Sequence, residues 1–284
     1  MITADERPER LGRLDAWRVA PMGVPLGPPL LLVHGLGGGP WGWENFQRRF
    51  AENGYLSYAV ELPGHGSDVN SPRAGELGAF SIETYALYLA SALAELGQCV
   101  VIGHSMGGLI AQKLAESHDQ AGYVFLCSAP PWHMFRRAYW AMWRRLLWHP
   151  WRQIVAPVIG RTVLLDDSLQ DELVNNRLSP EARAIVGGKD VPDSGRASMQ
   201  MVVGLVTIDA SQVRSPCLVV GSTDDRLIPP SEQRLIAKKY ACPLQLYDRG
   251  HMLLLEDGWE EIADGILSWV AALPAARADM AASI

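Results

Sequence analysis

The sequence predicts an α/β fold in which a mostly parallel sheet is covered by helices on both faces. Two observations point to it. Short apolar runs alternate along the chain with stretches whose apolar residues recur at spacings of three and four. The runs are continuous, which is typical of strands buried on both faces. Strands that alternate with helices in this way indicate parallel neighbours joined by right-handed crossovers.

The first half of the chain shows this alternation most clearly. Strands are expected at 30–34, 55–60, 99–102 and 123–127. Helices are expected at 43–53, at 82–96 and from about residue 106 onward. Ser81 stands directly before the second helix, where a serine can accept a hydrogen bond from an unpaired backbone N–H group. Glycines follow the first strand immediately, so we expect the chain to turn sharply there.

The same pattern returns near the end of the chain. Strands are expected at 217–220 and 244–247, and helices at 231–239 and 259–272. The tail from Pro274 onward is rich in alanine, and we expect it to fray.

The stretch between these two parts breaks the alternation. Residues 132–149 look helical, and residues 161–186 look like short helices, one of which begins at Ser179 with a proline in its first turn. A structureless loop of this length would be unusual. We therefore expect a core of residues 1–130 and 214–284, with residues 131–213 inserted late in the sheet as a helical cap.

Composition and charge exclude several classes of protein. The net charge of −6 gives no reason to expect a nucleic-acid partner. No run reaches the roughly 18 apolar residues of a membrane-spanning helix, and the first residues hold no apolar signal segment. The cysteines lack paired spacing, which argues against a zinc site and for free thiols; they are Cys99, Cys127, Cys217 and Cys242. We expect a cytoplasmic protein.

Residues 103–107, Gly-His-Ser-Met-Gly, fit the pattern G-x-S-x-G. The pattern alone is weak evidence, but here a strand runs into it and a helix runs out of it. A nucleophile on such a strained turn stands exposed above the sheet, and the two glycines remove Cβ atoms that would clash. The helix dipole at that point favours developing negative charge. We therefore predict that Ser105 is a nucleophile.

A serine hydroxyl needs a base and an acid that orients the base. In this architecture they follow the serine in the order acid, then histidine. His251 follows the last expected strand and is the predicted base. The acid is expected in the loop after the strand 217–220, where both Asp224 and Asp225 fit.

Five motifs in this order resemble the α/β-hydrolase family, in particular its capped bacterial carboxylesterases, monoacylglycerol lipases and meta-cleavage-type hydrolases. They are LLVHG at 31–35, ELPGHGSD at 61–68, GHSMGG at 103–108, DRLIP at 225–229 and GHMLLLE at 250–256. In the family the acid commonly stands four residues before a proline, which favours Asp225. The commonest spacing from Gly221 would instead select Asp224; we predict Asp225 as the acid.

The resemblance also implies an oxyanion hole made of two backbone N–H groups. One comes from Met106, the residue after the nucleophile, and the other from Leu36, the residue after His34-Gly35. His34, His65 and His104 are expected to pack rather than react.

The cap gives the only indication of substrate. Residues 132–151 hold five of the ten tryptophans and four arginines but no acid. We expect a cap helix that buries an apolar stripe over the pocket; the alternative is an interfacial helix that contacts lipid or another subunit. The stripe comprises Phe135, Tyr139, Met142, Trp143 and Leu146. An aromatic roof favours hydrophobic acyl or alcohol groups in the substrate.

The sequence thus predicts a serine carboxylic-ester hydrolase that acts through an acyl-enzyme on a small hydrophobic ester, without a cofactor or a metal. The closest alternative is another reaction of the same three residues: hydrolysis of a C–C bond, a lactone or a thioester, or perhydrolysis. The alternative from a different class is a ligand receptor on a hydrolase fold. The oligomeric state stays open.

Overall fold

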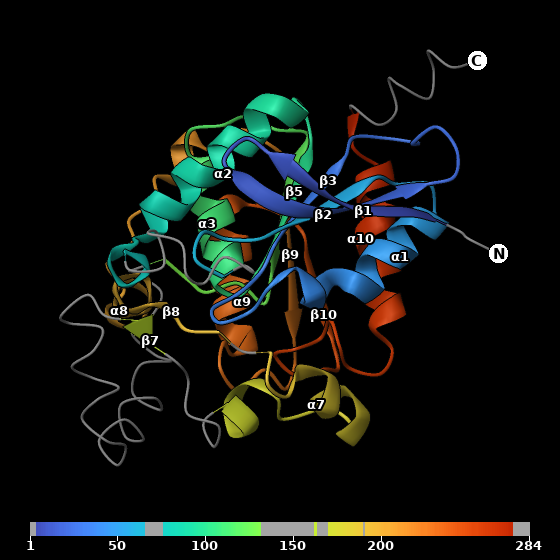
Figure 1. Cartoon of the computed structure of the whole chain (residues 1–284). Helices are drawn as coiled ribbons and strands as arrows, with labels where there is room; N and C mark the ends of the chain where they lie inside the picture. The colour runs from blue at the N-terminus through green and yellow to red at the C-terminus, as the bar shows by residue number, and fades with distance from the viewer. Residues whose placement is uncertain (1–3, 66–75, 132–161, 164–169, 190, 275–284) are drawn as a thin grey trace.

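The computed structural model describes residues 4–65, 76–131, 162–163, 170–189 and 191–274 (Figure 1). At its centre is an eight-stranded sheet with the strand order β1-β2-β4-β3-β5-β6-β9-β10. The strands are β1 (Ala4–Leu11), β2 (Leu14–Pro21), β3 (Leu30–Val33), β4 (Ser57–Val60), β5 (Val100–His104), β6 (Gly122–Leu126), β9 (Cys217–Ser222) and β10 (Leu244–Tyr247). From β4 to β10 all neighbours are parallel, as predicted.

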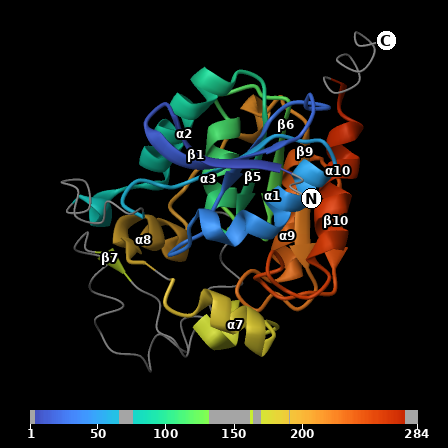
Figure 2. The ribbon, with the colours of Figure 1, turned by 45° about the vertical axis from the view of Figure 1, so that its right-hand side comes forward.

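Helices cover both faces of the sheet, so two apolar layers form (Figures 1 and 2). The helices on the core are α1 (Glu44–Glu52), α2 (Ile82–Leu96), α3 (Met106–Ala115), α9 (Pro230–Tyr240) and α10 (Trp259–Ala271). Alternate strand residues divide between the layers: Leu31 belongs to the cluster that includes residues of α2, α3 and α9, whereas Leu32 belongs to the one that includes residues of α1 and α10. The five helices predicted for the core are therefore confirmed, including the Ser81 cap, whose side chain accepts from the backbone N–H of Thr84.

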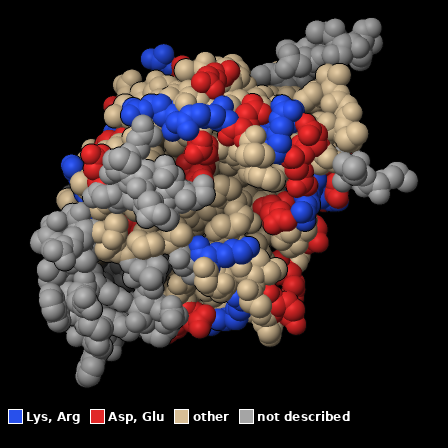
Figure 3. Space-filling model, viewed as in Figure 1, with Lys and Arg blue, Asp and Glu red and all other residues tan. Residues whose placement is uncertain are grey.

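The sheet begins with an antiparallel hairpin that the sequence analysis did not predict. β1 pairs with β2, and β2 pairs with β4. The strand β1 reads ADERPERL, and most of it is exposed, so it lacks the apolar run by which the other strands were found. Figure 3 shows acidic and basic side chains interspersed over this face. Charges along an edge strand discourage pairing with another chain.

The described part of the insertion between β6 and β9 contains both helices and strands. Two short strands, β7 (Thr162–Val163) and β8 (Asp193–Ser194), pair in antiparallel fashion. The prediction that 161–186 forms only short helices is wrong at β7, because its partner lies some thirty residues away and local periodicity does not report such pairing.

The helix predicted to begin at Ser179 is confirmed. It is α7 (Pro180–Val186), and the Ser179 side chain accepts from the N–H of Ala182. A turn of π-helix, η4 (Gln170–Val174), precedes it, and α8 (Gly195–Val203) follows β8. The predicted aromatic and basic helix at 132–149 lies outside the described residues, so the division into core and cap stays a prediction.

Neither a helix able to cross a bilayer nor a disulfide occurs among the described residues. All four cysteines are free, and Cys99, Cys127 and Cys217 are buried, in keeping with their apolar surroundings in the sequence.

Candidate active site

Ser105 lies at the sharp turn between β5 and α3, in the backbone conformation that the motif predicts. Its φ is 54° and its ψ is −116°, values that strain any residue with a Cβ atom. The surrounding structure holds this turn: the Ser105 N–H donates to the Leu126 carbonyl, and the Ser105 carbonyl accepts from Ala129, both at 3.0 Å. Ser105 is thereby held as the N-cap of α3, where the helix dipole is positive.

The glycines of this turn are required by space. A Cβ atom on Gly103 would lie 2.2 Å from the carbonyl oxygen of Gly107, and one on Gly107 would lie 2.3 Å from that of Val33. Both obstacles are backbone atoms, which no rotamer change can move away. Helix α3 can therefore approach β5 and β3 this closely only with glycine at both positions.

His251 and Asp225 complete a hydrogen-bonded chain that ends at Ser105. The Nε2 atom of His251 lies 3.0 Å from the Ser105 hydroxyl oxygen, and its Nδ1 atom lies 2.8 Å from the Asp225 carboxylate. His251 and Asp225 are 1% and 4% exposed, so water hardly competes for these bonds. The structure thus brings together the three side chains that the sequence singled out.

Of the two aspartates that fitted the sequence, Asp225 is the one that faces His251. Its second carboxylate oxygen accepts from the backbone N–H groups of Leu227 and Ile228, which fixes its orientation. Asp224 points elsewhere: its side chain is 39% exposed and forms ion pairs with Arg177 and Arg226.

Two further side chains hold the loop that carries His251. Glu256 accepts a hydrogen bond from the backbone N–H of Gly250 at 2.7 Å, and His104 contacts the His251 carbonyl oxygen at 3.0 Å. Burial raises the pKa of Glu256. Glu256 stands in the motif at 250–256, but its sequence position predicted no role for it, because spacing does not distinguish a buried carboxylate from an exposed one.

The loop after β3 lies directly against Ser105. A Cβ atom on Gly35 would come within 2.9 Å of the Ser105 Cβ atom. The loop turns back on itself through a hydrogen bond from Gly38 N–H to the Gly35 carbonyl and through Gly37, whose φ is 69°. Leu36 therefore stands beside the nucleophile, and Met106 begins α3 immediately after it.

His34 and His104 are buried beside this site, and burial lowers the pKa of each to about 3. A neighbouring histidine lowers it further in both cases, His65 for His34 and His251 for His104. His34 has a clear packing role, since its Nε2 atom accepts from the backbone N–H of Leu62. Both rings are neutral in the folded chain, in agreement with the expectation that they pack.

We expect the imidazole signals of His34 and His104 to stay unchanged in an NMR titration from pH 7.5 to about pH 4.5. In the unfolded chain both imidazoles have the ordinary histidine pKa of about 6.5 and bind protons below that pH. Since the folded pKa values are lower, these two groups favour the folded state above that pH and cost stability as the pH falls. Titration of either ring near pH 6.5 would contradict its burial. Glutamine variants at each position assign the signals.

His65 does more than pack in its loop. Its Nε2 atom lies 2.8 Å from the carboxylate of Asp193, and both side chains are buried. Burial opposes the charge on His65, but the carboxylate outweighs it and the pKa of His65 is raised. Asp193, which the sequence analysis did not single out, comes from the insertion and also accepts from Gly37 N–H of the loop beside Ser105.

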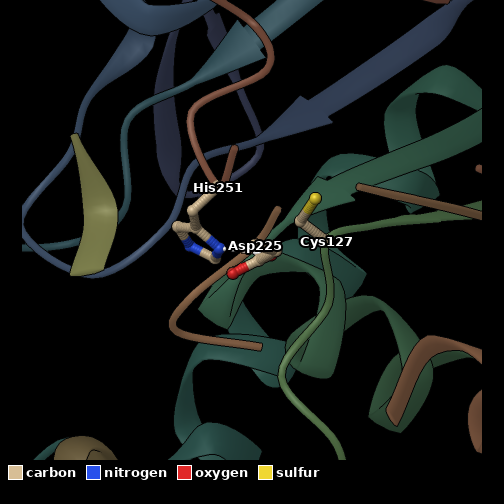
Figure 4. Close-up of side chains that lie close together, drawn as sticks. All are labelled: Cys127, Asp225 and His251. Atoms are coloured by element: carbon tan, nitrogen blue, oxygen red, sulfur yellow. Dashed lines mark hydrogen bonds and ion pairs between the residues drawn. The ribbon is translucent and has the colours of Figure 1, made fainter. Parts of the chain in front are cut away.

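A cysteine adjoins the other end of the site. The ligand atoms of Cys127, Asp225 and His251 all lie within 4.8 Å of one another, and Figure 4 shows the three side chains converging. Burial raises the pKa of the Cys127 thiol well above its usual value, so it stays protonated. A metal binds the thiolate form, and His251 and Asp225 already bond each other. The donor set therefore suits a packed thiol better than a metal ligand.

Comparison with known proteins gives one family. A model described as the alpha/beta hydrolase family matches residues 30–265. A pimeloyl-(acyl-carrier protein) methyl ester esterase of Aeromonas hydrophila is 40% identical over 94 residues, which are 33% of this chain and 34% of that protein. The dihydrolipoyllysine-residue acetyltransferase component of the acetoin cleaving system of Pseudomonas putida is 31% identical over 267 residues.

That second match covers 89% of this chain and 66% of the Pseudomonas protein, so the chain spans about a third and about two thirds of the lengths of these two relatives. Among solved structures, a monoacylglycerol lipase of Paleococcus ferrophilus superposes with a TM-score of 0.69 at 24% identity. The superposition covers 91% of this chain and 98% of the lipase, so the two share their fold.

Proposed function

The chain belongs to the alpha/beta hydrolase family, and from that premise we propose that it is a serine hydrolase that cleaves carboxylic esters. One observation carries the proposal: the continuous hydrogen-bonded chain from Asp225 through His251 to Ser105, with Ser105 on the strained turn between β5 and α3. This arrangement activates a hydroxyl that is a poor nucleophile by itself.

In the proposed reaction the Ser105 oxygen attacks the ester carbonyl carbon while His251 Nε2 takes the hydroxyl proton. Asp225 stabilises the resulting imidazolium and stays ionised. The N–H groups of Leu36 and Met106 bind the oxyanion. When the C–O bond to the alcohol breaks, His251 returns its proton to the leaving oxygen. A water then attacks the acyl-enzyme by the same steps, which releases the acid and restores Ser105.

The apolar surroundings support a hydrophobic substrate. Leu178, Ala182 and Val186 form a buried cluster in the insertion, and Trp41, Met252 and Leu255 pack against it. Met252 follows His251 directly, so the cluster packs on the loop that carries His251. In the proposal, residues 131–213 form a cap whose apolar side covers the acyl or alcohol group. A sequence relative that is named a methyl ester esterase, and a structural neighbour that is a monoacylglycerol lipase, are consistent with an ester substrate.

The test is labelling by a fluorescent fluorophosphonate, with hydrolysis of p-nitrophenyl butyrate measured in parallel, on the wild-type protein and on Ser105→Ala. We expect both signals in the wild type and neither in the variant, because the probe and the ester need the same activated oxygen. Labelling without turnover would favour another bond type or a receptor. A folded wild type that takes no label would overturn the proposal of an activated serine.

A further inference from the structure

We propose that Asp193 is a positioning residue for the loop that supplies Leu36 to the oxyanion hole, and that segment 191–194 of the insertion thereby sets the geometry of catalysis. The inference rests on the proposed function, since it assigns a role within that reaction. Asp193 stands far from Ser105 in the sequence and would act through Gly37, the residue after Leu36.

Segment 191–194 holds both polar groups of Gly37. The Gly37 N–H donates to the Asp193 carboxylate at 2.9 Å, and the Gly37 carbonyl accepts from the N–H of Val191 at 3.2 Å. Gly37 has a φ of 69°, which a free loop would adopt only as one of many conformations. Two hydrogen bonds from one segment therefore fix the peptide units on either side of Gly37, directly after Leu36.

The carboxylate of Asp193 is fully occupied. The oxygen that accepts from Gly37 also lies 2.8 Å from His65 Nε2, and the other oxygen accepts from the hydroxyl of Tyr85 and from the N–H of Ser194. Burial opposes the charge, but His65 and these donors prevail and the pKa of Asp193 is lowered. A buried carboxylate with three hydrogen-bond donors and an ion pair to His65 is held in one orientation, so it is a rigid support for the loop.

If Asp193 had only a structural role, it would anchor segment 191–194 to the core without positioning the loop of Leu36. Another residue of the insertion, Gln200, makes hydrogen bonds of that purely anchoring kind. Gln200, on α8, accepts from the backbone N–H of Ile82 at 2.8 Å and donates to Glu83 at 2.9 Å. These bonds anchor the same part of the insertion on α2. No contact between Gln200 and Gly37 occurs among the described hydrogen bonds, so Gln200→Ala is a matched control.

The experiment compares Asp193→Ala, Asp193→Asn and Gln200→Ala with the wild type. It measures kcat and KM on p-nitrophenyl butyrate, the rate of fluorophosphonate labelling, and Tm. A misplacement of about 1 Å near the reacting atoms costs on the order of 100-fold in rate. We therefore expect kcat and the labelling rate to fall about 10- to 100-fold in Asp193→Ala, with KM nearly unchanged. Gln200→Ala should lower Tm and leave kcat unchanged.

Asp193→Asn decides the matter if the alanine variant fails to fold. It keeps the volume, but each carboxylate oxygen faces donors, so the new NH₂ group must face a donor on one side. We expect a loss of about 10-fold in kcat. Wild-type kcat in a folded Asp193→Asn or Asp193→Ala would overturn the inference and leave the proposed function standing. Equal losses in the Asp193 variants and Gln200→Ala would assign Asp193 to anchoring alone. An inactive, unlabelled wild type would instead overturn the proposed function.

Discussion

Replacing Asp225 by asparagine should lower kcat about 10⁴-fold, the size of effect known when a buried triad aspartate loses its charge in a serine protease. The carboxylate lies 2.8 Å from His251 Nδ1. Its other oxygen is fixed by Leu227 and Ile228, both N–H donors, so the asparagine amide NH₂ must take the position that faces His251. His251 Nδ1 would then accept a hydrogen bond from this NH₂ group, and the ring proton would sit on Nε2. With Nε2 already protonated, His251 could not take the proton of the Ser105 hydroxyl.

The neighbouring Asp224→Asn is the matched control. It removes the same charge one residue away, from a side chain that is 39% exposed and contacts arginines at 3.6 and 3.8 Å. Exposed ion pairs of this kind contribute little, so kcat should stay close to the wild-type value. Steady-state hydrolysis of p-nitrophenyl butyrate by both variants is the measurement. A large loss in Asp224→Asn with little change in Asp225→Asn would reverse the assignment of the acid.

The sequence located the strands and helices that carry the site because their signals are local. A continuous apolar run identifies β5, and the glycines on either side of Ser105 identify the turn. The choice between Asp224 and Asp225 is different in kind. Both follow β9 within a few residues, and only the direction in which the loop turns each side chain separates them. Hydrogen bonds to Leu227 and Ile228 make that choice in the structure. In the sequence only the family's spacing to Pro229 favoured Asp225, and the spacing from Gly221 opposed it.

Asp193 shows the same limit at longer range. Asp193 is buried because His65, Tyr85 and Gly37 surround it, and these partners stand more than a hundred residues away in the chain. No pattern around an aspartate reports partners at that distance. Strand β1 was missed for the opposite reason: its exposed, charged residues carry no apolar signal, although its backbone pairs fully with β2.

Replacing Gly107 by alanine should cost at least about 3 kcal/mol of folding stability, which is the upper end of the usual cost of overpacking. The added Cβ atom would lie 2.3 Å from the Val33 carbonyl oxygen and 2.5 Å from that of His34. Val33 belongs to β3 in the middle of the sheet, so its carbonyl cannot give way without moving the strand. For a chain of this size, a loss of that order lowers Tm by roughly 6–12 °C.

Gly42→Ala provides the control, because a Cβ atom there would meet nothing within 4 Å. Thermal unfolding of the two variants and the wild type measures the difference. If both variants melt together, α3 does not approach β3 as closely as the structure shows.

Gly107→Ala should also reduce activity beyond its effect on folding. Val33 and His34 lead into the loop of Leu36, and Gly107 follows Ser105 by two residues. A displacement of α3 from β3 therefore separates the nucleophile from one of the two proposed oxyanion donors. We expect kcat per folded molecule to fall in Gly107→Ala at a temperature well below its Tm, as misplaced catalytic groups predict. Unchanged kcat per folded molecule would mean that the strain is absorbed elsewhere in α3.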